Sequence, residues 1–227
     1  AYEWIKTCNS DSKNIKENQN GNGQMIKKGP GDRLSPTQWQ FLQADALTGF
    51  DVDASMVKIA TMNLILHGLE KSRIIRRDSV AGSPDDWDEQ EFDVILTNPP
   101  FAGTINKERV KKSLPVQATD TTILFLGLMI EELRQGGRAG VIVNEGVLFN
   151  RNRAAKELRR YLTDRKNLLA VVSLPGGVFQ PYSGVKTSVL FFNNDGKKTG
   201  KVWFYDVRYD GFELATQRRP SPDKNDL

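Results

Sequence analysis

The sequence predicts an α/β domain with a mostly parallel β-sheet that carries helices on both faces. Strand-like and helix-like segments alternate along most of the chain, which is the pattern of βαβ units. Several strand-like segments are unbroken aliphatic runs, as expected for parallel strands that are buried on both faces. With 227 residues, 38% of them hydrophobic, the chain is long enough to form one ordinary core.

The N-terminal part of the chain is more polar than the rest. Residues 1–8, AYEWIKTC, look like the end of a helix. Residues 9–36 are rich in Gly, Asn and Lys and hold almost nothing apolar, so we expect a long loop whose composition permits disorder. These differences divide the chain into a polar N-terminal piece (1–36), a main catalytic domain (37–207) and a polar C-terminal extension (208–227).

Strands and helices follow one another through the main domain. Apolar runs bounded by turn residues predict strands over 46–53, 73–79, 92–97, 138–146, 168–175, 187–194 and 201–207. Segments of helix-forming composition predict helices over 54–69, 119–137 and 152–164. The second helix has a Thr/Asp start and a Gly-Gly stop, which are ordinary boundary signals. The connections include an acidic loop, SPDDWDEQ, and a Gly-rich one, GGVFQPYSGVK.

The composition argues against membrane and disulfide-rich proteins. No apolar run is long enough to span a membrane and the start lacks a signal-peptide pattern, so we expect a cytoplasmic protein with no membrane partner. The only cysteine, Cys8, cannot form an internal disulfide and has no His or Cys neighbours at metal-binding spacing. We therefore expect a reducing compartment and no metal site.

Polar side chains stand at the ends of three predicted strands. Asp51, Asp78 and Asn98 each lie at or just past such an end. Turn propensity alone would account for any one of them. Because ligands of parallel sheets bind at the carboxyl ends of strands, the three together define a candidate site on one rim.

The segment LTNPPFAG, residues 96–103, follows a predicted buried strand directly. Pro99 and Pro100 remove two backbone donors and fix two φ angles, and Pro99 also keeps Asn98 extended. A plain turn would more often use Gly or Asp. The sequence therefore predicts a stiff strand end that holds an amide, Asn98, and an aromatic ring, Phe101, side by side.

The net charge of +4 is mildly basic and is clustered, which fits a nucleic-acid partner. One cluster comprises Arg73, Arg76 and Arg77, and another runs from Arg151 to Arg160. For each cluster a solvated face is the simple alternative. The cluster that follows the NPPF segment is the one that we expect to contact DNA phosphates. Its members are Lys107, Arg109, Lys111 and Lys112.

The order of these segments resembles that of a known family. TNPPF resembles the Asp/Asn/Ser-Pro-Pro-aromatic motif of amino-group DNA methyltransferases. The segments GFDVD, ATMNLILHG, RRDSV, FDVILTNPPF, GGRAGVIVNEGVLF and LPGGVF…GVKTSVLFF occur in the order found in modification subunits of type I restriction-modification systems. The tail DGFELATQRRPSPDKNDL is similar as well, so the resemblance covers residues 40–227 nearly continuously. It implies a Rossmann-like methyltransferase fold, S-adenosylmethionine as methyl donor and the N6 amino group of a flipped adenine as acceptor.

The resemblance also implies roles for the residues of the NPPF segment. The adenine amine is a poor nucleophile and needs acceptors for both N–H bonds as charge develops. The side-chain oxygen of Asn98 and the backbone carbonyl of Pro99 are implied as these acceptors. The rigid Pro99–Pro100 backbone keeps them in position. Phe101 is implied to stack on a base turned out of the duplex, and Phe179 is a candidate for the opposite face of that base.

Two carboxylates are implied to bind the methyl donor. Asp51 matches the acid that pairs with the donor's ribose hydroxyls, although the family often has Glu there, and Asp78 would approach the donor's adenine amine. The alternative role for Asp51 is to cap the next helix, for which Asp53 is better placed. His67, the only histidine, is expected to have a capping or packing role.

One element of the family pattern is missing. The family binds the methionine part of the donor with a glycine-rich loop of the type DPACGSGGF, and this sequence has no such loop. NGNGQ and KKGPGD do not follow an apolar strand and so fail the context test. We expect either a fragment that begins after that loop and lacks the first strand, or a natural donor-free relic. In both cases we expect weak or no donor binding and no activity by this chain alone.

Two rival functions stay open from the sequence. Protein-glutamine and RNA amino-methyltransferases use the same motif, and a non-catalytic DNA-binding or assembly module could keep the fold. For the preferred function the implied partners are DNA, a specificity subunit and, where the system has one, a restriction subunit. The sequence does not contain the DNA target, because in this family a separate specificity subunit reads it.

Overall fold

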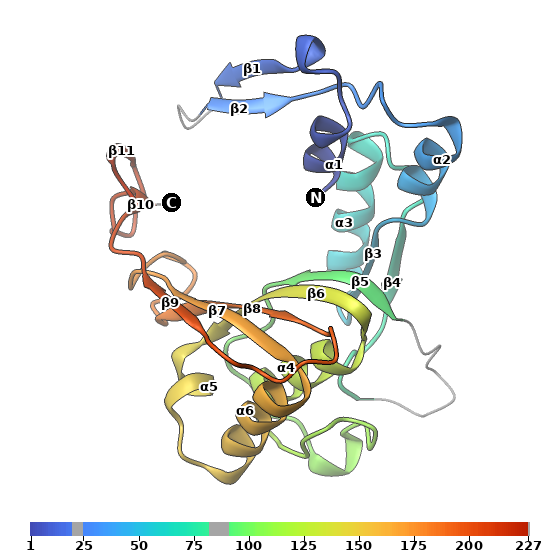
Figure 1. The fold of residues 1–227 in the computed structure, drawn as a ribbon. Helices are drawn as coiled ribbons and strands as arrows, with labels where there is room; N and C mark the ends of the chain where they lie inside the picture. Colours follow the sequence, from blue (N-terminus) through green and yellow to red (C-terminus); the bar gives the residue numbers. More distant parts are fainter. Residues whose placement is uncertain (20–24, 82–90, 227) are drawn as a thin grey trace. The chain divides into compact units, whose positions relative to one another are not determined.

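The computed structural model describes residues 1–19, 25–81 and 91–226. The chain divides into two compact units, Ala1–Ser79 and Val80–Leu227, and each has its own sheets (Figure 1). The acidic loop expected at 83–90 lies outside the described residues.

The N-terminal part of the first unit contains a hairpin where a loop was expected. Helix α1 (Tyr2–Cys8) is followed by the short 3₁₀ helix η1 (Ser12–Asn14), and β1 (Lys16–Gln19) pairs antiparallel with β2 (Met25–Lys28). The expectation of a loop over 9–36 is therefore wrong for these strands. Their side chains are almost all exposed, so backbone hydrogen bonds hold the pair with little apolar burial, and composition alone gave no sign of it.

The rest of the first unit is a β-α-β arrangement. The parallel strands β3 (Thr48–Asp51) and β4 (Arg73–Arg76) are joined by α3 (Ala54–Leu66), which packs on both. As expected, Asp53 is the N-cap of α3, and its side chain accepts a 2.6 Å hydrogen bond from the Ser55 amide. Helix α2 (Pro36–Ala44) was not predicted, although Ser35 and Gln38 form a capping box at its start, which is a sequence signal for a helix.

The second unit is built on a five-stranded sheet with the order β5-β6-β8-β7-β9. β5 pairs parallel with β6 and β7 pairs parallel with β9, while β8 runs antiparallel to both of its neighbours. The mostly parallel sheet is thus confirmed, with one strand reversed. The reversal follows from the connection, because residues 174–186 join β7 to β8 without a crossover helix. The strands are β5 (Phe92–Thr97), β6 (Leu133–Asn144), β7 (Asn167–Ser173), β8 (Thr187–Asn193) and β9 (Trp203–Asp206).

The core of this unit lies under one face of the sheet. Helices α4 (Thr121–Glu131), α5 (Glu145–Phe149) and α6 (Arg153–Arg165) all lie on that face (Figure 1). α4 and α6 pack on each other and on β6 and β7 respectively. The fully buried side chains there include Leu124, Ile130, Leu158 and Phe192. Helices covering the other face of this sheet stay a prediction.

The boundary between α4 and β6 differs from the expected one. The helix expected over 119–137 ends at Glu131, and the Gly-Gly pair lies inside β6. Gly136 has a φ of +81°, which L side chains rarely adopt, and the β5–β6 register shifts between Phe92 and Val94. The two glycines therefore form an irregular strand entry rather than a helix stop.

The C-terminal extension also has regular structure. β10 (Asp210–Phe212) and β11 (Pro220–Asn225) form a two-stranded antiparallel hairpin with an irregular register. The sequence analysis described residues 208–227 only as polar, because short polar strands lack the apolar alternation by which strands are recognised.

The burial pattern predicts how the second unit responds to truncation of its core. Leu158 on α6 is 0% exposed, so Leu158→Ala should lower the free energy of unfolding by about 2–5 kcal/mol. Urea denaturation followed by circular dichroism measures the loss. Leu96, 68% exposed on β5, supplies the matched control, and Leu96→Ala should change stability by less than about 1 kcal/mol. Equal losses at the two positions would contradict this core.

Candidate functional site

The NPPF segment begins directly where β5 ends. Pro99 is buried and Phe101 is half-buried, whereas Asn98 and Pro100 are exposed. Within the described residues, the side-chain amide of Asn98 makes no hydrogen bond. The side chain is therefore presented to solvent with its oxygen available as an acceptor, while the neighbouring proline ring fixes its backbone.

Two side chains from other elements hold the carbonyl groups of this segment. The hydroxyl of Thr122, which is 1% exposed at the start of α4, donates to the Pro100 carbonyl at 3.2 Å. The Nδ2 of Asn144, at the end of β6, donates to the Phe101 carbonyl at 2.5 Å and to the Thr122 hydroxyl oxygen at 3.2 Å. Asn144 also caps α5 by accepting from the Val147 amide at 3.2 Å.

The sequence analysis missed both of these anchors. Asn144 was assigned to a strand and Thr122 to a helix start, and neither was given a role. The available signal was Asn144, since an Asn between a buried strand and a short helix suggests a cap. Nothing local in the sequence connects either residue to the NPPF segment. Asn144, for example, is 43 positions away from Phe101 along the chain.

Gly103 completes the turn out of the segment. Its φ is +146°, and a Cβ built there would lie 2.9 Å from the Thr121 hydroxyl oxygen. The Gly103 carbonyl accepts from the Thr121 amide at 3.1 Å and from the Thr121 hydroxyl at 3.3 Å. The backbone from 98 to 103 is thus tied to the N-terminus of α4 at both its middle and its end.

The structure brings the rings of Phe101 and Phe179 into contact, and their stacking on a base stays a prediction. Their ring centroids lie 5.2 Å apart with an interplanar angle of 57°. Phe179 comes from the loop between β7 and β8. Two rings that sandwich a flat base must stand about 7 Å apart, since each aromatic contact needs roughly 3.5 Å. A base can therefore enter between them only if at least one ring moves aside.

The two carboxylates that were predicted to bind the donor, Asp51 and Asp78, lie in the first unit, at the carboxyl ends of the parallel strands β3 and β4. Asp51 Oδ1 accepts from the Asp53 amide at 2.8 Å, and the Asp51 carbonyl accepts from the Arg77 amide at 2.8 Å. Asp51 is therefore not the cap of α3. Asp78 follows one residue after Arg77, whose guanidinium carbon lies 3.6 Å from the centroid of the Phe50 ring. Asn98 belongs to the second unit, and the common rim for all three residues stays a prediction.

The basic cluster after NPPF lies in a closed loop of the second unit. The loop is closed by a bridge between Thr104 and Asp120 and by a 3.0 Å bond from the Ile105 amide to the Thr119 carbonyl. The four basic residues lie in or just after the 3₁₀ helix η3, and only Lys111 is half-buried. Their contact with DNA phosphates stays a prediction. They are Lys107 and Arg109, within η3 (Lys107–Arg109), and Lys111 and Lys112 beyond it.

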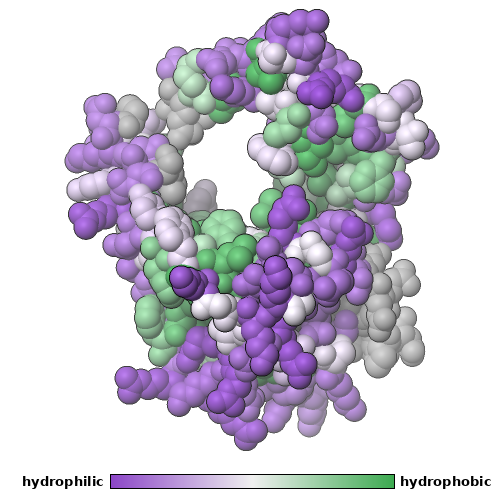
Figure 2. Space-filling model, in the orientation of Figure 1, coloured by the Kyte–Doolittle hydropathy of each residue, from purple (hydrophilic) through white to green (hydrophobic). Residues whose placement is uncertain are grey.

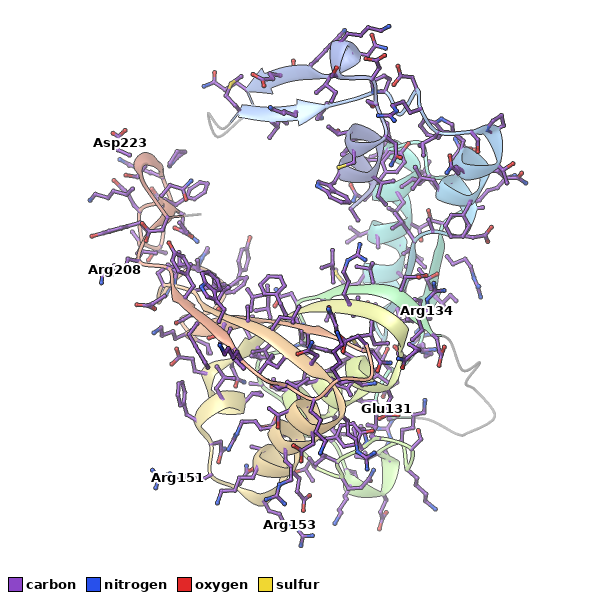
Figure 3. The ribbon with its side chains drawn as sticks, viewed as in Figure 1. Glu131, Arg134, Arg151, Arg153, Arg208 and Asp223 are labelled. Atoms are coloured by element: carbon purple, nitrogen blue, oxygen red, sulfur yellow. The ribbon has the colours of Figure 1, made fainter. Side chains whose placement is uncertain are left out.

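Part of the basic cluster from Arg151 to Arg160 has a structural role. Arg159 donates to the carbonyls of Val147 at 2.7 Å and Asn150 at 2.9 Å, so it ties α5 to α6. Arg151 and Arg153 extend away from the body of the unit (Figure 3), and Arg153 pairs with Glu157 at 2.7 Å. The surface over this helix is hydrophilic (Figure 2). This arrangement is that of a solvated helix face.

The only histidine of the chain has the structural role that was expected of it. His67 is the C-cap of α3, and its Nδ1 lies 2.8 Å from the Asn63 carbonyl oxygen, as its expected capping role requires. No group of three or more His, Cys, Asp or Glu side chains in the described part of the chain is arranged to hold a metal ion. No helix in that part is long and apolar enough to cross a membrane.

Comparison with known proteins identifies the family. A family model described as N-6 DNA Methylase matches residues 36–225. The chain belongs to this family. The methylase subunit of the type I restriction enzyme EcoEI from Escherichia coli is 43% identical over 166 residues, covering 71% of this chain and 33% of that protein. The EcoKI methylase subunit from Escherichia coli K12 is 33% identical over 175 residues, covering 72% and 32%.

The chain spans about a third of the length of these curated relatives. The crystal structure of the EcoKI M protein superimposes with a TM-score of 0.71 at 27% identity, covering 85% of this chain and 42% of that one. The resemblance to type I modification subunits and the Rossmann-like methyltransferase fold are therefore confirmed.

The close contact at Gly103 predicts a sensitive position. Gly103→Ala should lower the free energy of unfolding by about 1–3 kcal/mol, because it forces a side chain into a strained φ and against Thr121. Urea denaturation measures the change.

The control for this substitution is Gly176→Ala. A Cβ at Gly176 meets nothing within 4 Å, and its φ lies outside the left-handed region. The control should leave stability within about 1 kcal/mol of the parent chain. If both variants behave alike, the anchored turn is not as described.

Proposed function

We propose that the protein containing this chain transfers a methyl group from S-adenosylmethionine to the N6 amino group of an adenine in DNA, as the modification subunit of a type I restriction-modification system. The observation that carries the proposal is the anchored NPPF segment, which presents the Asn98 amide to solvent beside the Phe101–Phe179 pair. Membership of the N-6 DNA methylase family supports the acceptor atom.

The anchoring suits the chemistry of a poorly nucleophilic amine. Catalysis needs two acceptors fixed where the N–H bonds will lie, rather than a strong base. The carbonyls of Pro100 and Phe101 are engaged by Thr122 and Asn144, so the backbone cannot turn without breaking those bonds. The oxygen of Asn98 and the carbonyl of Pro99 are then the acceptors for the amine, already in place before the base arrives.

The aromatic pair suits a base that has left the duplex. An adenine inside the stack cannot reach a methyl donor, so it must be flipped out and held by stacking. We propose that the flipped adenine displaces the contact between Phe101 and Phe179 and lies against Phe101, with Phe179 on its other face. The basic residues 107–112 would hold the phosphates of the surrounding strand.

The donor site rests on the first unit. S-adenosylmethionine supplies the methyl group when bound. Asp51 fits its ribose hydroxyls, since Oδ1 is held by the Asp53 amide and the second carboxylate oxygen is left to accept. Asp78 is proposed for the donor's adenine amine. Because this chain has no glycine-rich donor loop, we propose that it binds the donor weakly or not at all by itself.

The proposed macromolecular partners are those of a type I restriction-modification system. The names of the relatives place them in type I restriction enzymes, so we propose DNA, a specificity subunit and, in systems that have one, a restriction subunit as partners in the cytoplasm. The family description, N-6 DNA Methylase, favours DNA over protein or RNA as the substrate. The solvent-exposed Asn98 side chain favours catalysis over a binding module.

Removal of the Asn98 acceptor tests the proposal. The full-length protein, co-purified with its specificity subunit, is given labelled S-adenosylmethionine and DNA, and digested DNA is analysed for N6-methyladenine. Asn98→Ala should reduce the rate about 10²–10³-fold, as loss of one preorganised hydrogen-bonding group does elsewhere. Asn98→Asp keeps an acceptor and should retain measurable activity.

Three results would contradict the proposal. Label found on protein or on RNA would move the substrate to the first rival class. Full activity in Asn98→Ala would remove the role of the NPPF segment. No label, with donor and DNA binding intact, would leave a non-catalytic binding module.

The Asp51 assignment predicts a different kinetic signature. Asp51→Asn should raise the KM for S-adenosylmethionine about 10–100-fold with little change in kcat, because it replaces the charged carboxylate that accepts from the donor's ribose hydroxyls with a neutral amide. Asp53→Asn is the matched control, since it removes the same charge two residues away and Asn is an equally good helix cap. Steady-state kinetics at varied donor concentration measure both. An unchanged KM in Asp51→Asn would remove Asp51 from the donor site.

A further inference from the structure

A half-buried arginine, Arg218, joins the C-terminal hairpin to the loop that carries Phe179. Arg218 lies in the turn between β10 and β11, and its side chain is 16% exposed. Its Nη1 donates to the Val178 carbonyl and its Nη2 to Oδ2 of Asp210, whose side chain is 9% exposed. The guanidinium carbon lies 5.1 Å from the centroid of the Phe212 ring.

The hydrogen bond from Arg218 to the Val178 carbonyl links the loop of residues 175–185 to a residue outside it. Among the described residues, the other hydrogen bonds of residues 175–185 stay inside the loop, for example from the Gln180 amide to the Gly177 carbonyl at 3.0 Å. Val178 precedes Phe179, whose ring contacts Phe101 at 5.2 Å. A continuous path therefore runs from the hairpin through Arg218 to the aromatic pair of the site.

The ion pair is not arranged for stability alone. Arg218 Nε and Asp210 Oδ1 are buried and have no hydrogen-bond partner among the described residues. Burying charged groups with such atoms unsatisfied is unfavourable, and a buried ion pair often contributes less to stability than apolar residues of the same volume. What the pair does supply is directed geometry, since the planar guanidinium fixes a carbonyl and a carboxylate at once.

We propose that Arg218, oriented by Asp210, is a positioning residue for the methyl transfer proposed above, on which this inference rests. It holds the backbone next to Phe179, so that the ring can turn away from Phe101 and return onto the face of a flipped adenine. The C-terminal hairpin is in this way part of the apparatus that holds the target base.

The test is a set of rate measurements on the full-length protein with its specificity subunit and a DNA that it methylates. Arg218→Ala should lower kcat about 10–100-fold, because it misplaces a group that orients the base. The KM for S-adenosylmethionine should not change. Arg218→Lys keeps the charge without the two directed bonds and should give an intermediate rate. Arg219→Ala removes the same charge from the adjacent exposed residue and should leave kcat unchanged.

A double-mutant cycle separates positioning from general destabilisation. If Arg218 acts through Phe179, Arg218→Ala should lower kcat less than twofold when added to Phe179→Ala, since coupled residues are not additive. Amide hydrogen exchange gives a second readout that needs no activity. Peptides covering 175–183 should exchange faster in Arg218→Ala than in Arg219→Ala.

The outcomes are distinguishable. A wild-type complex that labels no DNA adenine contradicts the proposed function. An active wild-type complex in which the Arg218 and Phe179 losses multiply overturns the positioning role alone. Unchanged exchange over 175–183 in Arg218→Ala also overturns it.

Discussion

The structure of the candidate site depends on how the carbonyl groups of Pro100 and Phe101 are satisfied. Two consecutive prolines end β5 by removing donors, but Pro100 and the following Phe101 still present carbonyl oxygens that need partners. Thr122 and Asn144 supply those partners. Since these side chains start α4 and end β6, the segment is fixed to the same elements that form the core of the second unit.

This arrangement separates what is rigid in the site from what can move. The NPPF side of the aromatic pair is held by two anchors and by the tight turn at Gly103. The Phe179 side lies in a loop whose bonds are mostly its own, with Arg218 as the tie from outside. A base that must enter between the rings therefore meets one fixed face and one adjustable face, as a flipped nucleotide requires.

The features that the sequence analysis missed or predicted wrongly have a physical explanation. The two short hairpins, β1–β2 and β10–β11, are built mostly from polar residues, and the side chains of β1 and β2 are almost all exposed. Hydrophobic periodicity therefore does not reveal them. The Gly-Gly pair at 136–137 carries the same signal for a helix stop and for a bulged strand entry. Only the register against β5 distinguishes the two.

The sequence by itself determined the α/β class, the order of most elements, the stiff strand end at NPPF and the family. Those features follow from local chemistry, such as proline geometry, caps and aliphatic runs. The tertiary structure decided the reversed β8, the anchors Thr122 and Asn144, the Phe101–Phe179 contact and the Arg218 tie. These contacts join residues 22 to 78 positions apart, as the 43 positions between Phe101 and Asn144 and the 40 between Val178 and Arg218 illustrate. No local pattern encodes such pairs, because only the packing of the sheet and its helices brings them within hydrogen-bond distance.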